Sequence, residues 1–380
     1  MPTNLLPTFA GMLIDAGRLE LLQPVGAGTY GVVYLAIDHE ASASSSVPVR
    51  RAVKIVRKAG PSKRDTQRQR REITIQKLVS GVPGVLKLLE VVEDDAYFYL
   101  VSDYHDCDLF NLIAEGVTFE GNDERIRSVF VQILDAVHGC HRKKVYHCDL
   151  KPENILCTAD GKEVFIADFG MATPIARSYV RGYGTHCYMS PECISTASGP
   201  YSTKHADIWA LGIILINLIA DGDRPWGEAS LEDPDFRRFI LEDEQFLERE
   251  FGISRGAADL LKRIFRLNPT ARPSLAQIRN NVLRLDTFFA EFEEEDVLDD
   301  EDDEMEGNPG EPVGSTSTSV DGSEGVGTPD NDPAVAPPIV GCKFMTFKSY
   351  ARPLLLPAKR GADDEFALAV IERLDALGLE

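Results

Sequence analysis

The chain has 380 residues, of which 43% are hydrophobic, and a formal net charge of −21 at pH 7. This length allows two or more domains, and the apolar content is ample for a packed core. The charge is uneven, because residues 291–306 contain twelve Asp or Glu and no Lys or Arg. The longest apolar run, residues 210–220, is too short for a membrane span and Asn217 interrupts it, so no membrane segment is expected.

The first residues, Met1 to Pro7, lack the basic region of a signal peptide. Seven cysteines form an odd set without a Cys-x-x-Cys pair, at positions 107, 140, 148, 157, 187, 193 and 342. We therefore expect reduced thiols in a protein of the cytoplasm, the nucleus or both.

The N-terminal segments predict strands at residues 32–36 and 97–101, which are rich in β-branched and aromatic side chains. Between them, the pattern predicts a helix from Lys63 to Ser80, which begins near Ser62 and is stopped by Gly81. Residues 41–46, Ala-Ser-Ala-Ser-Ser-Ser, predict a loop between two strands.

The C-terminal segments predict helices. After Asp123, apolar residues recur at helical spacing at positions 126, 129, 130, 133, 136 and 137. Strands followed by helices, in one run from about Arg18 to about Leu285, indicate an α+β fold with two lobes and an active-site cleft between them.

From Glu291 the composition changes. The acidic run leads into residues 307–340, which are rich in Gly, Ser, Thr and Pro and cannot bury enough apolar surface to fold. Residues 366–377 regain hydrophobicity and predict a short helix. We therefore divide the chain into a domain at 18–285, a disordered acidic and low-complexity linker at 286–340 and a C-terminal segment at 341–380.

Four short motifs lie within residues 18–285. Residues 26–33 fit Gly-x-Gly-x-x-Gly-x-Val, and the strand that follows favours a glycine hairpin over a dinucleotide-binding turn, with a plain hairpin as the alternative. Residues 52–55 are Ala-Val-Lys-Ile. Residues 146–154 are Tyr-His-Cys-Asp-Leu-Lys-Pro-Glu-Asn, and an Asp-Phe-Gly motif begins at Asp168, fourteen residues after Asn154.

Together these motifs resemble the active-site core of eukaryotic-type serine/threonine protein kinases. The resemblance implies a bilobal kinase fold, with an antiparallel sheet and one helix in an N-lobe of about 18–103 and a mainly helical C-lobe of about 104–285. The cofactors it implies are ATP and Mg²⁺. The wording of residues 146–154 and 188–192 is most similar to fungal cell-cycle or nutrient-response kinases.

The resemblance gives catalytic roles to five residues. Asp149 is expected to accept the proton of the substrate hydroxyl, and Lys151 to neutralise charge on the transferred γ-phosphoryl. Lys54 is expected to reach the α- and β-phosphates, with Glu72 as its helix partner. Thr185 is expected to orient Asp149 and Lys151. Lys151 and Thr185 both mark serine/threonine specificity in the family.

Asn154 and Asp168 are the expected Mg²⁺ ligands. For Asp149 or Asp168 taken alone, a turn cap is the alternative role. The hinge at residues 99–104 is expected to bind adenine, with Ser102 at the back of the pocket. The residues expected to contact ATP are Val25, Gly26, Gly28, Gly31, Val33, Ala52, Lys54, Asp103 and Asp108. For Asp108, an exposed helix N-cap is nearly as well supported.

Three further residues are expected to be structural. Glu192 would form a buried ion pair with Arg272, so that loss of either partner strands a charge. Asp207 would hold the backbone of the catalytic loop.

One catalytic-loop position departs from the family pattern. Cys148 stands where most members have Arg, which makes this a His-Cys-Asp, non-Arg-Asp variant. The family Arg pairs with a phosphate on the activation loop, and cysteine lacks that charge. We therefore predict activity that is largely independent of activation-loop phosphorylation. A redox role for Cys148 is disfavoured, because the nearby Asp149 carboxylate opposes the thiolate.

Two charged or polar clusters have competing interpretations. Residues 50–71 hold ten Lys or Arg and one acid, Asp65. A solvated helix face is favoured over a nucleic-acid patch, and a third hypothesis places the acidic run 291–306 against this stretch. A zinc site is disfavoured, because no Cys-x-x-Cys or His-x-x-x-His spacing occurs among residues 138, 140, 141, 147 and 148.

These observations predict an ATP-dependent serine/threonine kinase that acts on protein substrates. The acids Asp108 and Glu153 flank the expected peptide groove and predict a mild preference for Arg or Lys upstream of the phosphorylated residue. A pseudokinase or scaffold module is the alternative, and it is disfavoured by the presence of Lys54, Asp149, Asn154 and Asp168. No direct nucleic-acid or membrane binding is expected.

Overall fold

The computed structural model describes residues 7–28, 31–58, 63–115, 119, 121–195 and 199–290, which all belong to one compact unit of the chain. The acidic run, the rest of the linker to residue 340 and the expected helix at 366–377 lie outside the described residues. The hypothesis that the acidic run contacts residues 50–71 therefore stays a prediction.

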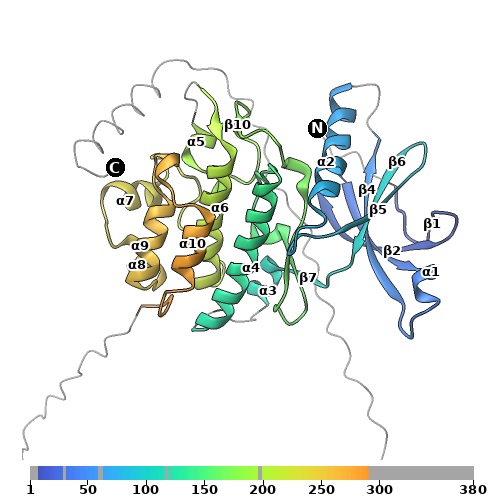
Figure 1. Cartoon of the computed structure of the whole chain (residues 1–380), viewed down its shortest axis with the longest axis horizontal. Coiled ribbons are helices and arrows are strands. Elements are labelled where there is room, and N and C mark those ends of the chain that lie inside the picture. The colour runs from blue at the N-terminus through green and yellow to red at the C-terminus, as the bar shows by residue number, and fades with distance from the viewer. Residues whose placement is uncertain are drawn as a thin grey trace, which may run out of the picture. The chain divides into compact units, whose positions relative to one another are not determined.

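The N-terminal part is a six-stranded antiparallel sheet (Figure 1). In the sheet the strands follow the order β1-β2-β3-β4-β6-β5. Their bounds are β1 Leu13–Ile14, β2 Leu19–Gly28, β3 Gly31–Asp38, β4 Val49–Arg57, β5 Leu88–Glu93 and β6 Tyr97–Asp103. The predicted strands 32–36 and 97–101 lie within β3 and β6. Alternate residues such as Val53 and Ile55 are fully buried in one core cluster, as the two-residue period of a strand requires.

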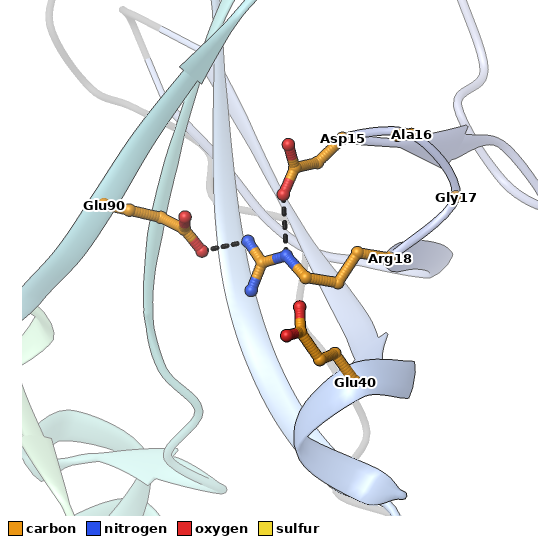
Figure 2. A pocket seen from close by; sticks show the side chains of 6 residues that line it. All are labelled: Asp15, Ala16, Gly17, Arg18, Glu40 and Glu90. Atoms are coloured by element: carbon orange, nitrogen blue, oxygen red, sulfur yellow. Dashed lines mark hydrogen bonds and ion pairs between the residues drawn. The ribbon is translucent and has the colours of Figure 1, made fainter.

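A surface ion cluster shows that this sheet is curled. Arg18, directly before β2, donates to Asp15 at 2.6 Å and also pairs with Glu90 on β5, although β2 and β5 are not neighbours in the sheet (Figure 2). Arg18 also lies 3.1 Å from Asp38, at the end of β3. Arg18 lines a surface pocket with Asp15, Ala16, Gly17, Glu40 and Glu90. This pocket lies at the N-terminal end of β2, whereas the glycines of β2 lie at its C-terminal end.

The expected loop at 41–46 is partly wrong, because helix α1, His39–Ser42, occupies its first two residues. The Asp38 side chain caps this helix by accepting a hydrogen bond from Ala41 N at 3.0 Å. The Ser42 hydroxyl donates back to the Asp38 carbonyl at 2.5 Å. An N-cap aspartate thus stabilises a single helical turn in a stretch whose composition is typical of loops.

Helix α2, Lys63–Val79, confirms the helix predicted between the strands and ends one residue earlier than expected. Its buried residues Glu72, Ile75, Gln76 and Val79 recur at i, i+3, i+4 and i+7, the spacing of one helix face. This face of the helix is buried, and the Glu72 side chain is buried with it.

The C-terminal part is mainly helical, which confirms the α+β class (Figure 1). The helices are α3 Leu109–Ala114, α4 Asp123–Arg142, α5 Pro191–Ile194, α6 Thr203–Ile219, α7 Pro234–Leu241, α8 Phe246–Phe251, α9 Arg255–Ile264 and α10 Leu275–Val282. Helix α4 buries Ile126, Val129 and Phe130 along the predicted stripe. Residues 210–219 of the apolar run are buried in α6, where Asn217 accepts a hydrogen bond from the Tyr188 hydroxyl at 3.0 Å. Among the described residues, no helix has the length and apolar character needed to cross a membrane.

Short strands position the candidate site within the helical part. β7 Cys107–Asp108, β8 Ile155–Cys157 and β9 Val164–Ile166 form a three-stranded sheet, and β10 Arg177–Ser178 pairs with β11 Tyr201–Ser202. Asn154 directly precedes β8, and Asp168 follows β9 by two residues. Because β8 and β9 are antiparallel neighbours, this places Asn154 and Asp168 at the same end of the sheet.

Residues 286–290, which the sequence analysis assigned to the linker, pack onto the helical part. Phe288 is fully buried, and its backbone N–H donates to Asp123 at 2.7 Å. Phe289 forms a β-bridge with Ile253, and Ala290 N donates to the Gly252 carbonyl at 2.7 Å.

Candidate active site

An ion triad joins the sheet, helix α2 and the Asp-Phe-Gly segment. Lys54, on the central strand β4, places Nζ 2.7 Å from Glu72 Oε1 and 2.8 Å from Asp168 Oδ1. The positive charge of Lys54 lowers the pKa of Asp168 to about 2. Burial opposes the charge on Lys54, but the two carboxylates outweigh it and raise the pKa of Lys54. Lys54 and Asp168 are therefore both charged near neutral pH.

Asp168 adopts a left-handed backbone conformation, with φ 56° and ψ 75°. Such a conformation is uncommon outside glycine and clusters at functional sites. It is supported locally, because the carboxylate accepts a hydrogen bond from Gly170 N at 3.3 Å. The Asp168 side chain remains 46% exposed, so it is accessible to a ligand.

The catalytic-loop side chains converge on Asp149. Its Oδ1 accepts hydrogen bonds from both N and Oγ1 of Thr185, each at 3.1 Å. Lys151 Nζ donates to the same Thr185 hydroxyl at 3.0 Å and lies 3.9 Å from Asp149 Oδ2. Asn154 Nδ2 donates to the Asp149 carbonyl at 2.8 Å and to Oδ2 at 3.3 Å. Four of the predicted site residues thus form one hydrogen-bonded group.

Asp207, on α6, fixes the backbone beneath this group. One carboxylate oxygen accepts from His147 N at 2.9 Å, and the other accepts from Cys148 N at 2.8 Å. His141 Nε2 lies 2.7 Å from the first of these oxygens. Cys148 has a φ of 64°, an uncommon value that these bonds stabilise. The role expected for Asp207, holding the catalytic-loop backbone, is matched by these contacts.

His147 links the catalytic loop to the Asp-Phe-Gly segment. Its Nε2 lies 3.0 Å from the Ala167 carbonyl, which can only accept, so Nε2 carries the proton. Nδ1 accordingly accepts from Asp149 N at 3.3 Å. These contacts account for His147 without a metal, and no cluster of potential metal ligands occurs among His, Cys, Asp and Glu in the described ranges.

The glycine hairpin is formed by β2 and β3, with Gly26 opposite Val33 and Gly28 opposite Gly31. Thr29 and Tyr30, at its tip, lie outside the described residues. Gly31 has a tertiary reason to be glycine, because an added Cβ would lie 2.3 Å from the Ile55 carbonyl oxygen. Sequence reasoning assigned the glycines to contact with ATP alone and did not detect this strand contact.

The predicted hinge is tied to β4 by two arginines that sequence reasoning treated as part of a solvated basic face. In the β4–β6 ladder Arg51 faces Asp103, and Arg51 Nη1 donates to its carboxylate at 2.5 Å. Arg50 Nη1 donates to Asp106 at 2.9 Å and stacks 4.9 Å from the centre of the Tyr104 ring. Strand register brings these residues together, and register is not visible in the sequence of either strand.

Comparison with known proteins identifies the family. The family model described as "Protein kinase domain" matches residues 19–283. The chain belongs to the protein kinase family.

The kinase is similar to several curated proteins. It is 36% identical over 281 residues to the "Negative regulator of sexual conjugation and meiosis" of Schizosaccharomyces pombe, covering 68% of this chain and 58% of the relative. It is 33% identical over 237 residues to the serine/threonine-protein kinase SKS1 of Saccharomyces cerevisiae, covering 58% and 46%. It is 32% identical over 299 residues to CBL-interacting protein kinase 24 of Oryza sativa, covering 77% and 62%. The chain thus spans about half to three fifths of the length of these relatives.

Asp108 of the kinase is a helix N-cap, but a buried one. Its Oδ1 accepts from Asn111 N at 2.8 Å at the start of α3, and its Oδ2 accepts from Asn111 Nδ2 at 3.0 Å. Burial raises the pKa of Asp108 to about 6, and the negative charge of Glu153 acts in the same direction. Both carboxylate oxygens are therefore engaged within the protein, and the expected contact with ATP stays a prediction.

The ion pair expected between Glu192 and Arg272 is present and buried. Arg272 Nη1 and Nη2 donate to the two Glu192 oxygens at 2.5 Å and 2.8 Å, and the Arg272 side chain is 0% exposed. Arg272 Nη1 also donates to the His205 carbonyl at 3.0 Å, and Nε donates to the Arg266 carbonyl at 2.9 Å. Residues 189–192 resemble the end of a kinase activation segment, and this pair anchors them to the helical lobe.

Cys148 is packed into the loop as a neutral thiol. Its Sγ donates to the Tyr146 carbonyl at 3.7 Å. Burial raises the pKa of Cys148 well above its usual value, with Asp207 adding to the effect. The thiolate that oxidation requires is therefore disfavoured at this position.

Proposed function

We propose that this chain is an ATP-dependent serine/threonine protein kinase that transfers the γ-phosphoryl of ATP to Ser or Thr hydroxyls of protein substrates. The observation that carries the proposal is the hydrogen-bonded group formed by Asp149, Lys151, Asn154 and Thr185. Phosphoryl transfer needs positioned charges more than covalent chemistry, and this group supplies them. The names of its relatives, among them serine/threonine-protein kinase SKS1, support the same activity.

In this mechanism Asp149 Oδ2 accepts the proton of the substrate hydroxyl, since Oδ1 is held by Thr185. Lys151 places a positive charge beside the same carboxylate. Lys54, fixed by Glu72, would bind the phosphates.

The residues present fit a magnesium site. Asp168 offers an exposed carboxylate. The side-chain nitrogen of Asn154 donates to Asp149, so the Asn154 Oδ1 is left to bind a hard cation. Bound Mg²⁺ would neutralise phosphate charge.

The test is incubation of the purified full chain with ATP, Mg²⁺ and peptides that contain Ser, Thr or Tyr, with Asp149→Asn as control. We expect phosphoserine and phosphothreonine from the unaltered chain only. If the chain were a pseudokinase or scaffold, the unaltered chain and Asp149→Asn would incorporate equally little phosphate, and that result would reject the proposal.

The six cysteines within the described ranges are free thiols, which supports a location in the cytoplasm, the nucleus or both.

Treatment with a protein phosphatase is expected to leave kcat/KM within about twofold of the value for the untreated protein. Cys148 supplies no charge to a phosphate, and other contacts order the activation segment. Arg181 donates to the Glu192 carbonyl at 3.2 Å and to the Gly199 carbonyl at 2.6 Å, and the Tyr201 hydroxyl donates to the Val180 carbonyl at 3.0 Å. Dephosphorylation is verified by mass spectrometry before the assay. Activity that disappears with the phosphate would contradict the prediction.

Glu153 is expected to bind a basic residue upstream of the phosphorylated site. Its Oε2 is buried, and within the described part of the chain it has no hydrogen-bond partner. A buried carboxylate oxygen without a donor is destabilised, and a substrate guanidinium or ammonium group would satisfy it.

Glu153→Gln is expected to reduce the kcat/KM preference for a peptide with upstream Arg by about tenfold, since hydrogen bonds to charged groups contribute about 1.5–3 kcal/mol. Glu228→Gln is the control, because the Glu228 carboxylate is already paired with His186 at 3.2 Å. A peptide array that favours acidic upstream residues would refute this assignment.

A further inference from the structure

Two cysteines face each other across the small sheet of the helical part. Cys107 on β7 is the register partner of Cys157 on β8, in an antiparallel ladder; we call these two residues the cross-strand cysteine pair. Directly opposed residues of antiparallel strands have Cα atoms about 4.5–5.5 Å apart. Disulfides join residues whose Cα atoms are about 4.4–6.8 Å apart, so the backbone already meets this requirement.

The Cys107 side chain also reaches β8. The Cys107 thiol lies 3.9 Å from the carbonyl oxygens of both Cys157 and Thr158, so it lies over β8. The Cys157 thiol donates to the Ile155 carbonyl at 3.7 Å. The other cysteines of the described ranges lie elsewhere: Cys140 is in α4, Cys193 is in α5, and the remaining two are in the catalytic loop and the activation segment.

The two sulfurs are not equivalent. Cys107 is half-buried, whereas Cys157 is fully buried. Interaction with the Cys157 side chain lowers the pKa of Cys107, and interaction with the Cys107 side chain, together with burial, raises the pKa of Cys157. Exposure and thiolate character are what select a cysteine for oxidation, and a neighbouring thiol then resolves the product.

We propose that Cys107 and Cys157 form a reversible disulfide when the protein meets hydrogen peroxide. The Cys107 thiolate attacks one peroxide oxygen, the O–O bond breaks, and a sulfenic acid and one water form. The Cys157 sulfur then attacks the Cys107 sulfur, the S–O bond breaks, and the hydroxyl leaves as a second water with the Cys157 proton. Two thiols lose two electrons in total, and one peroxide gains them. A small-molecule thiol reverses the step.

Strain keeps such a bond reversible. Opposed Cβ atoms in a sheet lie about 4.5–5.5 Å apart, whereas a disulfide holds them about 3.5–4.5 Å apart. Closing the bond therefore draws β7 and β8 together. Strained disulfides are more easily reduced than structural ones.

The cross-strand cysteine pair adjoins the proposed machinery. Asp108 follows Cys107 directly, and Asn154 precedes Cys157 by three residues. Oxidation is therefore expected to lower kcat about tenfold, because displacements of about 1 Å in positioning groups reduce rates strongly. This expectation rests on the proposed function.

The decisive experiment maps the bond and does not depend on kinase activity. The full chain is treated with hydrogen peroxide, remaining thiols are alkylated, and peptides are analysed by mass spectrometry without reduction. We expect one cross-linked peptide that joins Cys107 to Cys157 and disappears after dithiothreitol. Cys107→Ser and Cys157→Ala each remove it, while Cys342→Ser retains it. Thermal unfolding of Cys107→Ser, whose side chain is partly exposed, verifies that the variant is folded.

Two results of the mapping would overturn the proposal. A link from Cys107 to Cys342, or stable oxidation of Cys107 with Cys157 still free, would show that the cross-strand cysteine pair does not close. If the disulfide forms but the kcat of the active kinase does not change, the expected effect on kcat is wrong, while the assignment of the disulfide to Cys107 and Cys157 remains. A chain without kinase activity that still forms the bond would refute the proposed function alone.

Discussion

Asp149→Asn is expected to lower kcat about 10³-fold, within the range that general bases contribute to catalysis. The substitution keeps an oxygen that can accept the two hydrogen bonds from Thr185 at 3.1 Å. It replaces the oxygen near Lys151 with an amide group that cannot take up a proton. The loss should therefore fall on the chemical step and leave KM for ATP nearly unchanged. The measurement is steady-state phosphorylation of a Ser/Thr peptide with ATP and Mg²⁺.

The control for this prediction is Asp135→Asn. Asp135 is an aspartate of α4 whose side chain is 49% exposed and paired with Arg279 at 2.8 Å. It lies in none of the motifs, so kcat should not change. Unfolding temperatures of both variants should match that of the unaltered chain. Equal incorporation of phosphate by Asp149→Asn and by the unaltered chain would reject the assignment of Asp149 as the base.

Arg272→Met is expected to reduce the free energy of unfolding by about 3–5 kcal/mol, the usual consequence of leaving one charge of a buried ion pair without its partner. Glu192 would lose two hydrogen bonds, at 2.5 Å and 2.8 Å. The carbonyl groups of His205 and Arg266 would lose their donor as well. Urea denaturation of the full chain measures the change.

A double-mutant cycle separates the ion pair from the packing of Arg272. Adding Glu192→Gln to Arg272→Met removes the unpaired charge, so the double variant should be more stable than Arg272→Met alone. An exposed pair serves as the control: Arg237 and Glu242 lie 3.3 Å apart, with side chains 49% and 55% exposed. Removing that pair should cost less than about 1 kcal/mol. Strictly additive effects of Glu192→Gln and Arg272→Met would contradict a coupled buried pair.

Prediction from sequence worked best where chemistry and local periodicity coincide. The stripe of α2 carries Glu72 inward, and Lys54 lies between apolar neighbours on a central strand, so their contact at 2.7 Å could be anticipated from the two motifs. Prediction failed at residues 41 and 42, because the decisive group is the Asp38 carboxylate, which lies outside the Ser-rich stretch and caps α1. The segment 286–290 was assigned to the linker because the long-range partners of Phe288 are invisible in composition.

The sequence by itself determined the protein kinase motifs, their order along the chain and the residues expected to meet ATP and Mg²⁺, because phosphoryl transfer requires particular groups at particular spacings. Only the tertiary structure decided which side chains touch across strands. The β4–β6 register joins Arg51 to Asp103, and the β7–β8 register sets Cys107 against Cys157. Only the fold buries Asp108 as a helix cap beside Glu153. Register and burial depend on contacts between distant segments, and no local pattern of residues encodes them.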